Sequence, residues 1–289
     1  MRLIDTDSVV LYEFIGTGIP PYVILSHTWG RNEVSFQEIQ HVDAKVKIKT
    51  GYEKIKQCCQ MAAQYGFEYA WVDTCCIDKT SSAELSEAIN SMYRWYRFAE
   101  VCYVYLEDVP SGLEQAALEE KIRKSRWFTR GWTLQELIAP PSLIFFDNQW
   151  NELGTKESLS ALVSEITRIP ESVLQDADKL QEFSVAQKMS WASKRQTTRE
   201  EDIAYCLLGI FGVNMPMLYG EGEDAFIRLQ EEIIGKTHDH SIFAWYACSR
   251  SSLSSPLMRR QSRQYSLILA SLELRHLQCS HVQFPIGKC

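Results

Sequence analysis

The most distinctive pair of side chains in the sequence is a tryptophan and a glutamate four residues apart, Trp132 and Glu136. We predict a helix from about Arg130 that ends where the chain meets Pro140, because the residue before a proline avoids helical geometry. On this helix the pair shares one face, nearly opposite the apolar stripe that includes Leu134. A carboxylate beside a large aromatic ring, away from the core, is the strongest candidate for a functional site.

Each member of this pair also has an ordinary explanation. From position alone, the sequence favours a surface carboxylate at Glu136 that pairs with Arg130 or another cation, because glutamates are usually solvated. Trp132 is equally compatible with a ring that packs against a neighbouring element. We keep Arg130, Trp132 and Glu136 together as candidate residues, because position alone does not decide between these interpretations.

A second group of polar and aromatic side chains follows two short apolar runs. Ser26, His27 and Trp29 lie at the end of one run, and Asp73 lies at the end of the other. An acidic residue at the end of the second strand of an open α/β sheet can accept ribose hydroxyls. His27 with Asp73 or Glu136 would make an acid and base pair, although the sequence has no GxSxG nucleophile motif. Ser26 and His27 are equally able to cap the turn that follows.

These candidates need a sheet to position them, and four apolar runs predict one. The runs are at 22–26, 69–73, 101–106 and 143–147. Helical patterns separate them, which indicates an α/β fold with a mainly parallel, flavodoxin-like sheet and flanking helices. If the strand order is 2-1-3-4, a ligand binds at the carboxyl ends of the first and third strands. Ser26 and Glu136 would then meet at this point.

The alternation of strands and helices stops near Gly154. Only helical patterns follow, at about 156–168, 183–193, 199–211 and 222–235. We therefore expect an α/β domain over 1–155, an α-helical extension packed on it over 156–240, and a partly disordered tail over 241–289. Residues 1–19 are expected only to lead into the sheet.

Composition narrows the class of protein. A hydrophobic content of 45% with 11% aromatic residues is typical of a globular protein, and a net charge of −7 argues against nucleic-acid binding. The nine cysteines, odd in number and partly vicinal, favour reduced thiols in a cytoplasmic protein. We expect no membrane span, no metal and no bound cofactor, because the sequence lacks a long apolar run, a complete ligand set, a GxGxxG motif and a Walker A loop.

Three blocks of the sequence resemble the fungal heterokaryon-incompatibility (HET) domain. They are Pro21 to Gly30, Trp71 to Lys79 with the helix that follows, and Arg130 to Leu137. Trp191 to Gly222 is similar to the stretch that commonly follows this domain. The resemblance implies a role in fungal non-self recognition and regulated cell death. It does not extend to a nucleotide-binding oligomerisation module or repeats, and the tail from about Ser249 departs from the family pattern.

The HET domain is considered a remote relative of Toll/interleukin-receptor (TIR) domains, some of which cleave NAD with the glutamate of a WxxxE motif. The stretch from Trp132 to Glu136 matches that motif. The resemblance therefore implies an NAD glycohydrolase that takes NAD as a substrate, with Glu136 as its catalytic residue. The substrate-binding residues would be Ser26, His27, Trp29, Asp73, Arg130 and Trp132.

A second hypothesis comes from a different functional class. In it the domain is a non-enzymatic signalling module that self-associates or binds other proteins of the incompatibility or cell-death pathway. A third hypothesis is a nucleotide sensor that binds NAD or ATP without turnover. The sequence leaves all three open.

Overall fold

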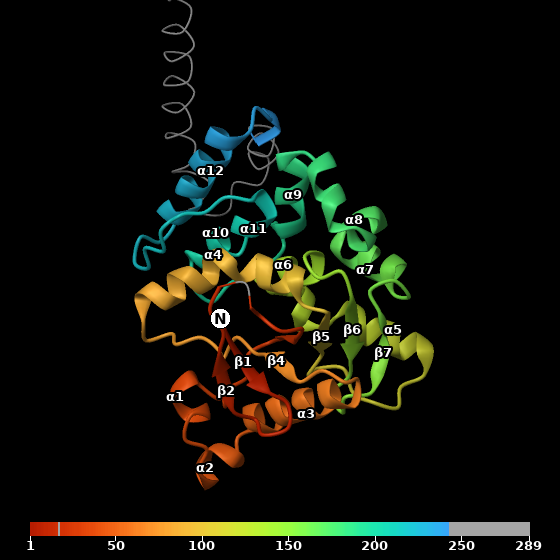
Figure 1. The fold of residues 1–289 in the computed structure, drawn as a ribbon. Coiled ribbons are helices and arrows are strands. Elements are labelled where there is room, and N and C mark those ends of the chain that lie inside the picture. The colour runs from red at the N-terminus through yellow and green to blue at the C-terminus, as the bar shows by residue number, and fades with distance from the viewer. Residues whose placement is uncertain (17, 243–289) are drawn as a thin grey trace, which may run out of the picture. The chain divides into compact units, whose positions relative to one another are not determined.

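A computed structural model of the chain describes residues 1–16 and 18–242 (Figure 1). At its centre is a seven-stranded sheet with the order β2-β1-β4-β3-β5-β6-β7. The strands are β1 Arg2–Asp5, β2 Leu11–Glu13, β3 Val23–His27, β4 Tyr69–Trp71, β5 Val101–Tyr105, β6 Leu143–Phe146 and β7 Glu152–Thr155.

The four central strands are those that the sequence predicts. They run parallel in the order β4-β3-β5-β6, which is the predicted order 2-1-3-4. All five residues of β3 are buried, because helices cover both faces of the sheet. This explains why the strand is a continuous apolar run with no polar alternation. The α/β fold with a mainly parallel central sheet is confirmed.

The two edges of the sheet differ from the prediction. β1 and β2 form an antiparallel hairpin that pairs with β4 on one side, and β7 pairs antiparallel with β6 on the other. Residues 1–19 therefore build part of the sheet and do not only lead into it. Each of these strands has three or four residues, too few for a periodic pattern to show in the sequence.

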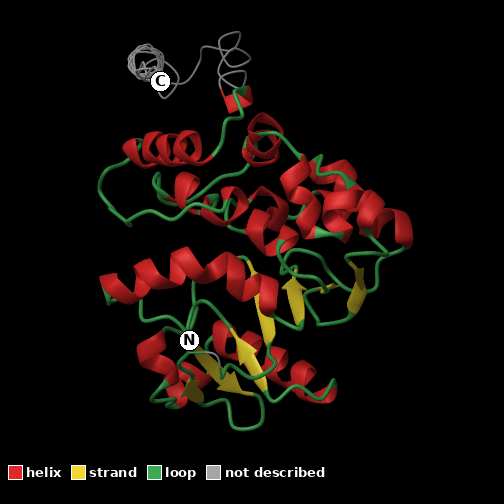
Figure 2. Ribbon diagram, turned by 45° about the horizontal axis from the view of Figure 1, so that its top comes forward, coloured by secondary structure: helices red, strands yellow, loops and turns green. Residues whose placement is uncertain are grey.

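Helices form a layer on each face of the sheet, as Figures 1 and 2 show. The α/β part contains α1 Phe36–Ile39, α2 Ala44–Lys47, α3 Thr50–Gln64, α4 Ser82–Phe98, α5 Gln115–Arg123, the 3-10 helix η1 Arg126–Thr129 and α6 Thr133–Ile138. α3 lies on one face, and α4 and α6 lie together on the other (Figure 1). α3 and α4 each bury one apolar stripe, which is the pattern of an amphipathic helix.

Seven further helical segments form the helical region that the sequence predicts after the sheet. They are α7 Ser160–Thr167, α8 Glu171–Gln175, the 3-10 helix η2 Ala177–Glu182, α9 Val185–Ala192, α10 Asp202–Tyr205, α11 Leu208–Phe211 and α12 Asp224–Lys236. Residues Met1–Asp239 make one compact unit, and the domain boundary after residue 155 stays a prediction. The predicted disorder of the tail lies outside the described residues, which end at Ile242.

Two other expectations concern the described part of the chain. Its six cysteines are buried free thiols, as expected for small core residues. None of its helices is long and apolar enough to span a membrane.

A glycine joins the helical region to the α/β part. Gly209 of α11 lies against Tyr93 of α4, and a Cβ atom at Gly209 would overlap the Tyr93 side chain. Because interiors are close-packed, an extra methyl group here must push the two helices apart. The close approach of α11 to α4 therefore depends on the absence of a side chain at this position.

We predict that Gly209→Ala lowers the free energy of unfolding by about 1 to 3 kcal/mol, the usual range for overpacking. Gly235→Ala is the matched control, because Gly235 lies in α12 with no atom near its missing Cβ. Alanine is the better helix former, so the control should be unchanged or stabilised by up to about 1 kcal/mol. Urea unfolding followed by circular dichroism measures both, and equal midpoints for the two variants would contradict the proposed contact.

Candidate functional site

The hydroxyl of Ser26 connects the end of β3 to α6. It donates to Oε2 of Glu136 at 2.5 Å and accepts a hydrogen bond from Nε1 of Trp127 at 2.8 Å. Ser26 and Trp127 have no exposed surface, and Glu136 is 8% exposed. The structure thus brings Ser26 and Glu136, 110 residues apart in the sequence, to the carboxyl end of the first predicted strand.

The environment of Glu136 corrects the sequence analysis. Helix α6 begins at Thr133 and not near Arg130, because Arg130 is extended and forms an isolated β-bridge with Gln196, where the N–H of Gly131 donates to the carbonyl of Gln196 at 2.9 Å. All six residues of α6 are buried, since β3 covers one side and α4 and α8 cover the others. Glu136 therefore does not lie away from the core as predicted.

Burial raises the pKa of Glu136 to about 8. The hydrogen bond from Ser26 and the charges of Arg130 and Arg195 lower this pKa, and the charge of Asp73 raises it further. Since desolvation is the dominant cause, Glu136 is largely protonated at neutral pH. A buried carboxyl group with such a raised pKa, next to the carboxyl end of a sheet strand, is typical of a functional site.

Arg130 and Trp132 face the helical region. Nη1 of Arg130 donates to Oγ1 of Thr198 at 3.3 Å. Burial raises the pKa of Asp202 in α10, and hydrogen bonds from Tyr219 and Trp132 oppose that shift. The charge of Arg130 lowers the pKa of Glu136, whereas Trp132 points to α10.

His27 lies on the other face of the sheet from Ser26. Successive side chains of a strand alternate between faces, so the two neighbours in β3 have different surroundings. Ser26 contacts α6, and His27 lies 3.9 Å from Glu33, whose other oxygen pairs with Lys54 of α3 at 2.6 Å. Ser26 and His27 are both predicted to bind the substrate, and the alternation places them on different faces of the sheet.

The imidazole of His27 is enclosed but unpartnered. Its side chain is 1% exposed, and Nε2 lies 3.9 Å from Oε2 of Glu33 and 3.9 Å from Oδ1 of Asp73. Neither ring nitrogen has a hydrogen-bond partner. Burial lowers the pKa of His27 well below its ordinary value, and the charges of Lys54 and Lys79 lower it further, so the ring is neutral.

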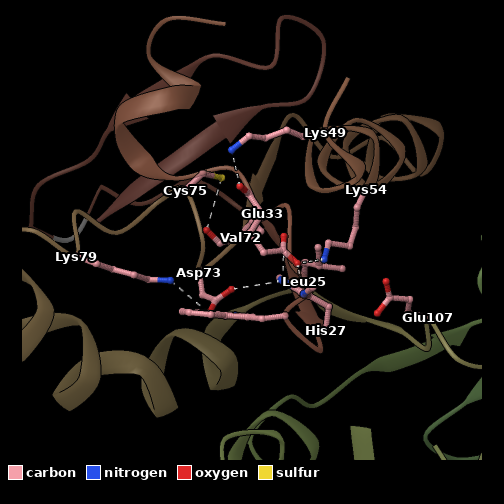
Figure 3. Close-up of polar contacts among 12 residues, drawn as sticks. Leu25, His27, Glu33, Lys49, Lys54, Val72, Asp73, Cys75, Lys79 and Glu107 are labelled. Carbon is pink, nitrogen blue, oxygen red and sulfur yellow. Dashed lines mark hydrogen bonds and ion pairs between the residues drawn. The ribbon is translucent and has the colours of Figure 1, made fainter. Parts of the chain in front are cut away.

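Asp73 connects this interior cluster to the surface. Its Oδ2 accepts a hydrogen bond from Nε1 of Trp29 at 2.9 Å and lies 4.0 Å from Nζ of Lys79. That ammonium also lies over the Trp29 ring, 3.6 Å from its centre. Burial raises the pKa of Asp73, and the charge of Lys79 and the Trp29 hydrogen bond oppose this shift. Figure 3 shows His27, Glu33 and Asp73 grouped between Lys54 and Lys79.

Sequence reasoning missed several members of the site. Lys79 is the last residue of the second motif block and Trp127 lies just before the third, yet neither is among the predicted site residues. Glu33 lies in a polar stretch and Lys54 lies on a helix, and neither position carries a motif that would single it out. In the structure the Gly30 N–H donates to Glu33 at 2.7 Å. No group of three or more His, Cys, Asp or Glu side chains in the described ranges could hold a metal ion.

Arg195, also missed, reaches the site from the helical region. Its Nη1 donates to the carbonyl of Arg130 at 2.9 Å and to Oγ1 of Thr133 at 2.8 Å. Arg195 is buried, and burial lowers its pKa to about 10. The guanidinium fixes the start of α6 and places a positive charge near Glu136.

The fold and this cluster define an open-sheet α/β domain with buried ionisable groups at the carboxyl ends of its central strands. Residues 22–114 match the family "Heterokaryon incompatibility protein (HET)", and residues 224–284 match "Domain of unknown function (DUF8212)". The second match includes much of the tail that the sequence analysis left without a family.

A characterised protein supports the same assignment. The chain is 48% identical over 224 residues to the vegetative incompatibility protein HET-E-1 of Podospora anserina, a match that spans 75% of this chain and 16% of that protein. No solved structure matches the chain. The chain therefore belongs to the HET-domain proteins, as its motifs predict, and the relation to TIR domains stays a prediction.

The raised pKa of Glu136 predicts a pH-dependent stability. Between pH 4.5 and about 8 the unfolded chain releases a proton that the folded chain keeps, so stability falls as pH rises through this window. Glu136→Gln keeps the shape and removes the titration. We expect the variant to gain roughly 3 to 5 kcal/mol over the wild type between pH 5 and pH 8, since each unit of pKa shift corresponds to about 1.4 kcal/mol.

Urea unfolding of both proteins at several pH values measures this difference. The contribution of His27 is common to both proteins and cancels in the comparison. A difference in stability that does not change with pH would show that the Glu136 carboxyl titrates normally in the folded chain.

Proposed function

We propose that the protein acts in heterokaryon incompatibility, the process named in its 48% identical relative. The match spans 16% of that protein, so the proposal concerns only the part that the two proteins share. The HET family match at residues 22–114 supports the same role. We further propose that the domain acts by cleaving NAD, with Glu136 as the catalytic carboxylate.

The observation that carries the NAD proposal is the Ser26–Glu136 contact at the switch point of the sheet. Ligands of open α/β sheets bind at the carboxyl ends of the strands, where connections leave to opposite faces. β3 and β5 are neighbours at the centre of the sheet, and the helices that follow them cover opposite faces (Figure 1). Glu136, in the first regular α-helix after η1, therefore reaches the place where such ligands bind.

The chemistry is displacement of nicotinamide from the ribose by water, which yields ADP-ribose, nicotinamide and a proton. Positive charge develops on the ribose as the bond to the ring nitrogen breaks, and a carboxylate beside that carbon lowers the barrier. The nicotinamide ring of NAD is itself cationic. Its approach favours ionisation of Glu136, whose pKa is about 8 without a ligand.

The other candidate residues take supporting roles in this proposal. Trp29 is 49% exposed, and its ring suits stacking on nicotinamide better than the ring of Trp132, which points to α10. Arg130 offers a guanidinium for phosphate oxygens. Asp73 accepts ribose hydroxyls, and Ser26 orients the catalytic carboxylate. Because Glu136 is 8% exposed, the substrate reaches it only when the contact between α6 and the end of β3 loosens.

We predict that Glu136→Gln lowers NAD cleavage by at least about a hundredfold, the usual effect of losing a group that stabilises the charge of the transition state. Glu201→Gln is the matched control, because Glu201 is also 8% exposed but accepts hydrogen bonds from the N–H groups of Gly220 and Gly222. The control should keep its activity. Release of nicotinamide, followed over a series of protein concentrations so that assembly is included, measures both.

The result can overturn the proposal in two ways. Equal cleavage by the wild type and Glu136→Gln would remove the assigned mechanism. Binding of NAD by the wild type without nicotinamide release, at every concentration, would make the domain a nucleotide sensor.

A second candidate function is a signalling module that acts by self-association or partner binding. An open groove of about 820 Å³ between the N-terminal hairpin and α4 favours it. Two large apolar side chains at its rim, Ile15 and Phe98, are 87% and 72% exposed. Exposed apolar groups around one groove are a feature of protein interaction sites.

If the groove signals, Phe98→Ser should abolish cell death in a fungal host while NAD cleavage stays at the wild-type level. Phe98 is already exposed, so the substitution should change the free energy of unfolding by less than about 0.5 kcal/mol. Ile48→Ser is the matched control, because Ile48 is 84% exposed and does not line the groove. Cell death that persists in Phe98→Ser and depends on Glu136 would favour the enzyme over the signalling module.

A further inference from the structure

The cluster around His27 contains buried polar atoms that have no partner. Both ring nitrogens of His27 and Oε2 of Glu33 are enclosed and unpartnered. An unpaired polar atom in the interior costs about 1 to 3 kcal/mol, so folded proteins rarely leave several in one place. We therefore expect polar groups of a ligand to form hydrogen bonds with these atoms.

The geometry fits a hydroxyl group between these atoms. Nε2 of His27 lies 3.9 Å from Oε2 of Glu33 and 3.9 Å from Oδ1 of Asp73, too far for direct hydrogen bonds. One oxygen atom that bonds to both ends of such a gap separates them by roughly 4 Å. Two adjacent hydroxyl groups would therefore bridge both gaps: the N–H at Nε2 of His27 is shared between their oxygens, and each hydroxyl donates its own proton to one carboxylate.

The charges of the cluster are already balanced, which favours an uncharged group of a ligand at this position. Each carboxylate already has its own cation, since Lys54 pairs with Glu33 at 2.6 Å and Lys79 lies 4.0 Å from Asp73. The pKa of His27 is held well below its ordinary value by burial, so the ring adds no charge. A metal ion or a phosphate would upset this balance, whereas hydroxyl groups donate to the carboxylate oxygens without adding charge.

We propose that His27, Glu33 and Asp73 form a binding site for the vicinal diol of a ribose, and that Glu33 decides its specificity. Glu33 is fixed for this role by Lys54 and by the Gly30 N–H, which both hold Oε1 and leave Oε2 facing His27. The ligand enters from the side of Trp29 and Asp73, the more exposed members of the cluster. Figure 3 shows how these side chains converge.

This assignment deepens the proposed NAD cleavage, because it gives the substrate a ribose subsite on the α3 face of the sheet. It rests on that proposal for the choice of ribose. The binding itself does not require catalysis, since ADP-ribose is a product of the reaction and is not cleaved by it. The two proposals can therefore fail separately.

The test is isothermal titration of the full chain with ADP-ribose and with two analogues, each lacking the hydroxyls of one ribose. We expect one analogue to bind the wild type at least about tenfold more weakly than ADP-ribose, as expected when buried acceptors lose their donors. Glu33→Gln should weaken ADP-ribose binding by a similar factor and should not weaken that analogue further.

The matched control is Glu38→Gln. Glu38 belongs to the same segment and pairs with Lys49 at 2.6 Å, but it lies outside the cluster and caps α1. It should bind ADP-ribose within about twofold of the wild type, as surface substitutions usually do. The analogue series on the wild type keeps the test valid even if Glu33→Gln does not fold.

Each outcome decides the assignment. No binding of ADP-ribose, equal binding of all three probes, or wild-type binding by folded Glu33→Gln would overturn it. Diol-dependent binding without NAD cleavage would support the subsite and reject the catalytic proposal. NAD cleavage that is unchanged in Glu33→Gln, together with equal probe binding, would reject the subsite and keep the catalytic proposal.

Discussion

The alternation of side chains along β3 is the constraint on which both halves of the site depend. Because neighbours on a strand point to opposite faces, Ser26 enters the layer of α4 and α6 and His27 enters the layer of α3. Two polar residues next to each other in sequence therefore nucleate two separate buried clusters. Burying the polar groups of either cluster in an apolar layer costs free energy, and interactions with residues from distant segments compensate for this cost. The end of this one strand sets where the ionisable groups of the domain can lie.

Asp73 is the group that both clusters share. It follows β4, the strand beside β3, by two residues; its carboxylate faces His27, and its charge raises the pKa of Glu136. In a medium of low polarity this interaction is not screened as it would be at the surface. A change in the ionisation or solvation of Asp73 is therefore felt on both faces of the sheet. A ligand that neutralises or hydrogen-bonds Asp73 would favour ionisation of Glu136.

The sequence was sufficient to predict the central strands and their order but not the detail of the site. Strands buried on both faces read as continuous apolar runs, and the alternation with helices restricts the topology. The same reasoning misplaced Glu136, because an amphipathic pattern assumes that one face of a helix is exposed. α6 is short and covered on every side, so its polar face is buried too. Glu33 and Lys54 were missed because their pairing joins a turn to a helix and leaves no periodic signal.

The helical region is part of the site's construction and not only an addition to the domain. The family match ends at residue 114, so α6 and Glu136 lie beyond it. The side chains that hold α6 in place belong to residues later in the chain. Arg195 bonds the residues that start the helix, and Lys156 donates to the carbonyls of Ile138 and Pro140 at its end, at 3.1 and 2.8 Å. Both cations are buried, and burial lowers their pKa.

Buried cations of this kind are stable only while their acceptors stay in place. The position of α6 and the folding of the segments around residues 156 and 195 are therefore coupled. Glu136 is held at the end of β3 by this coupling as well as by Ser26. A movement of the helical region relative to β3 would change the burial of Glu136, and with it the balance between its neutral and ionised forms. The helical region is thus placed to control the group on which the proposed chemistry depends.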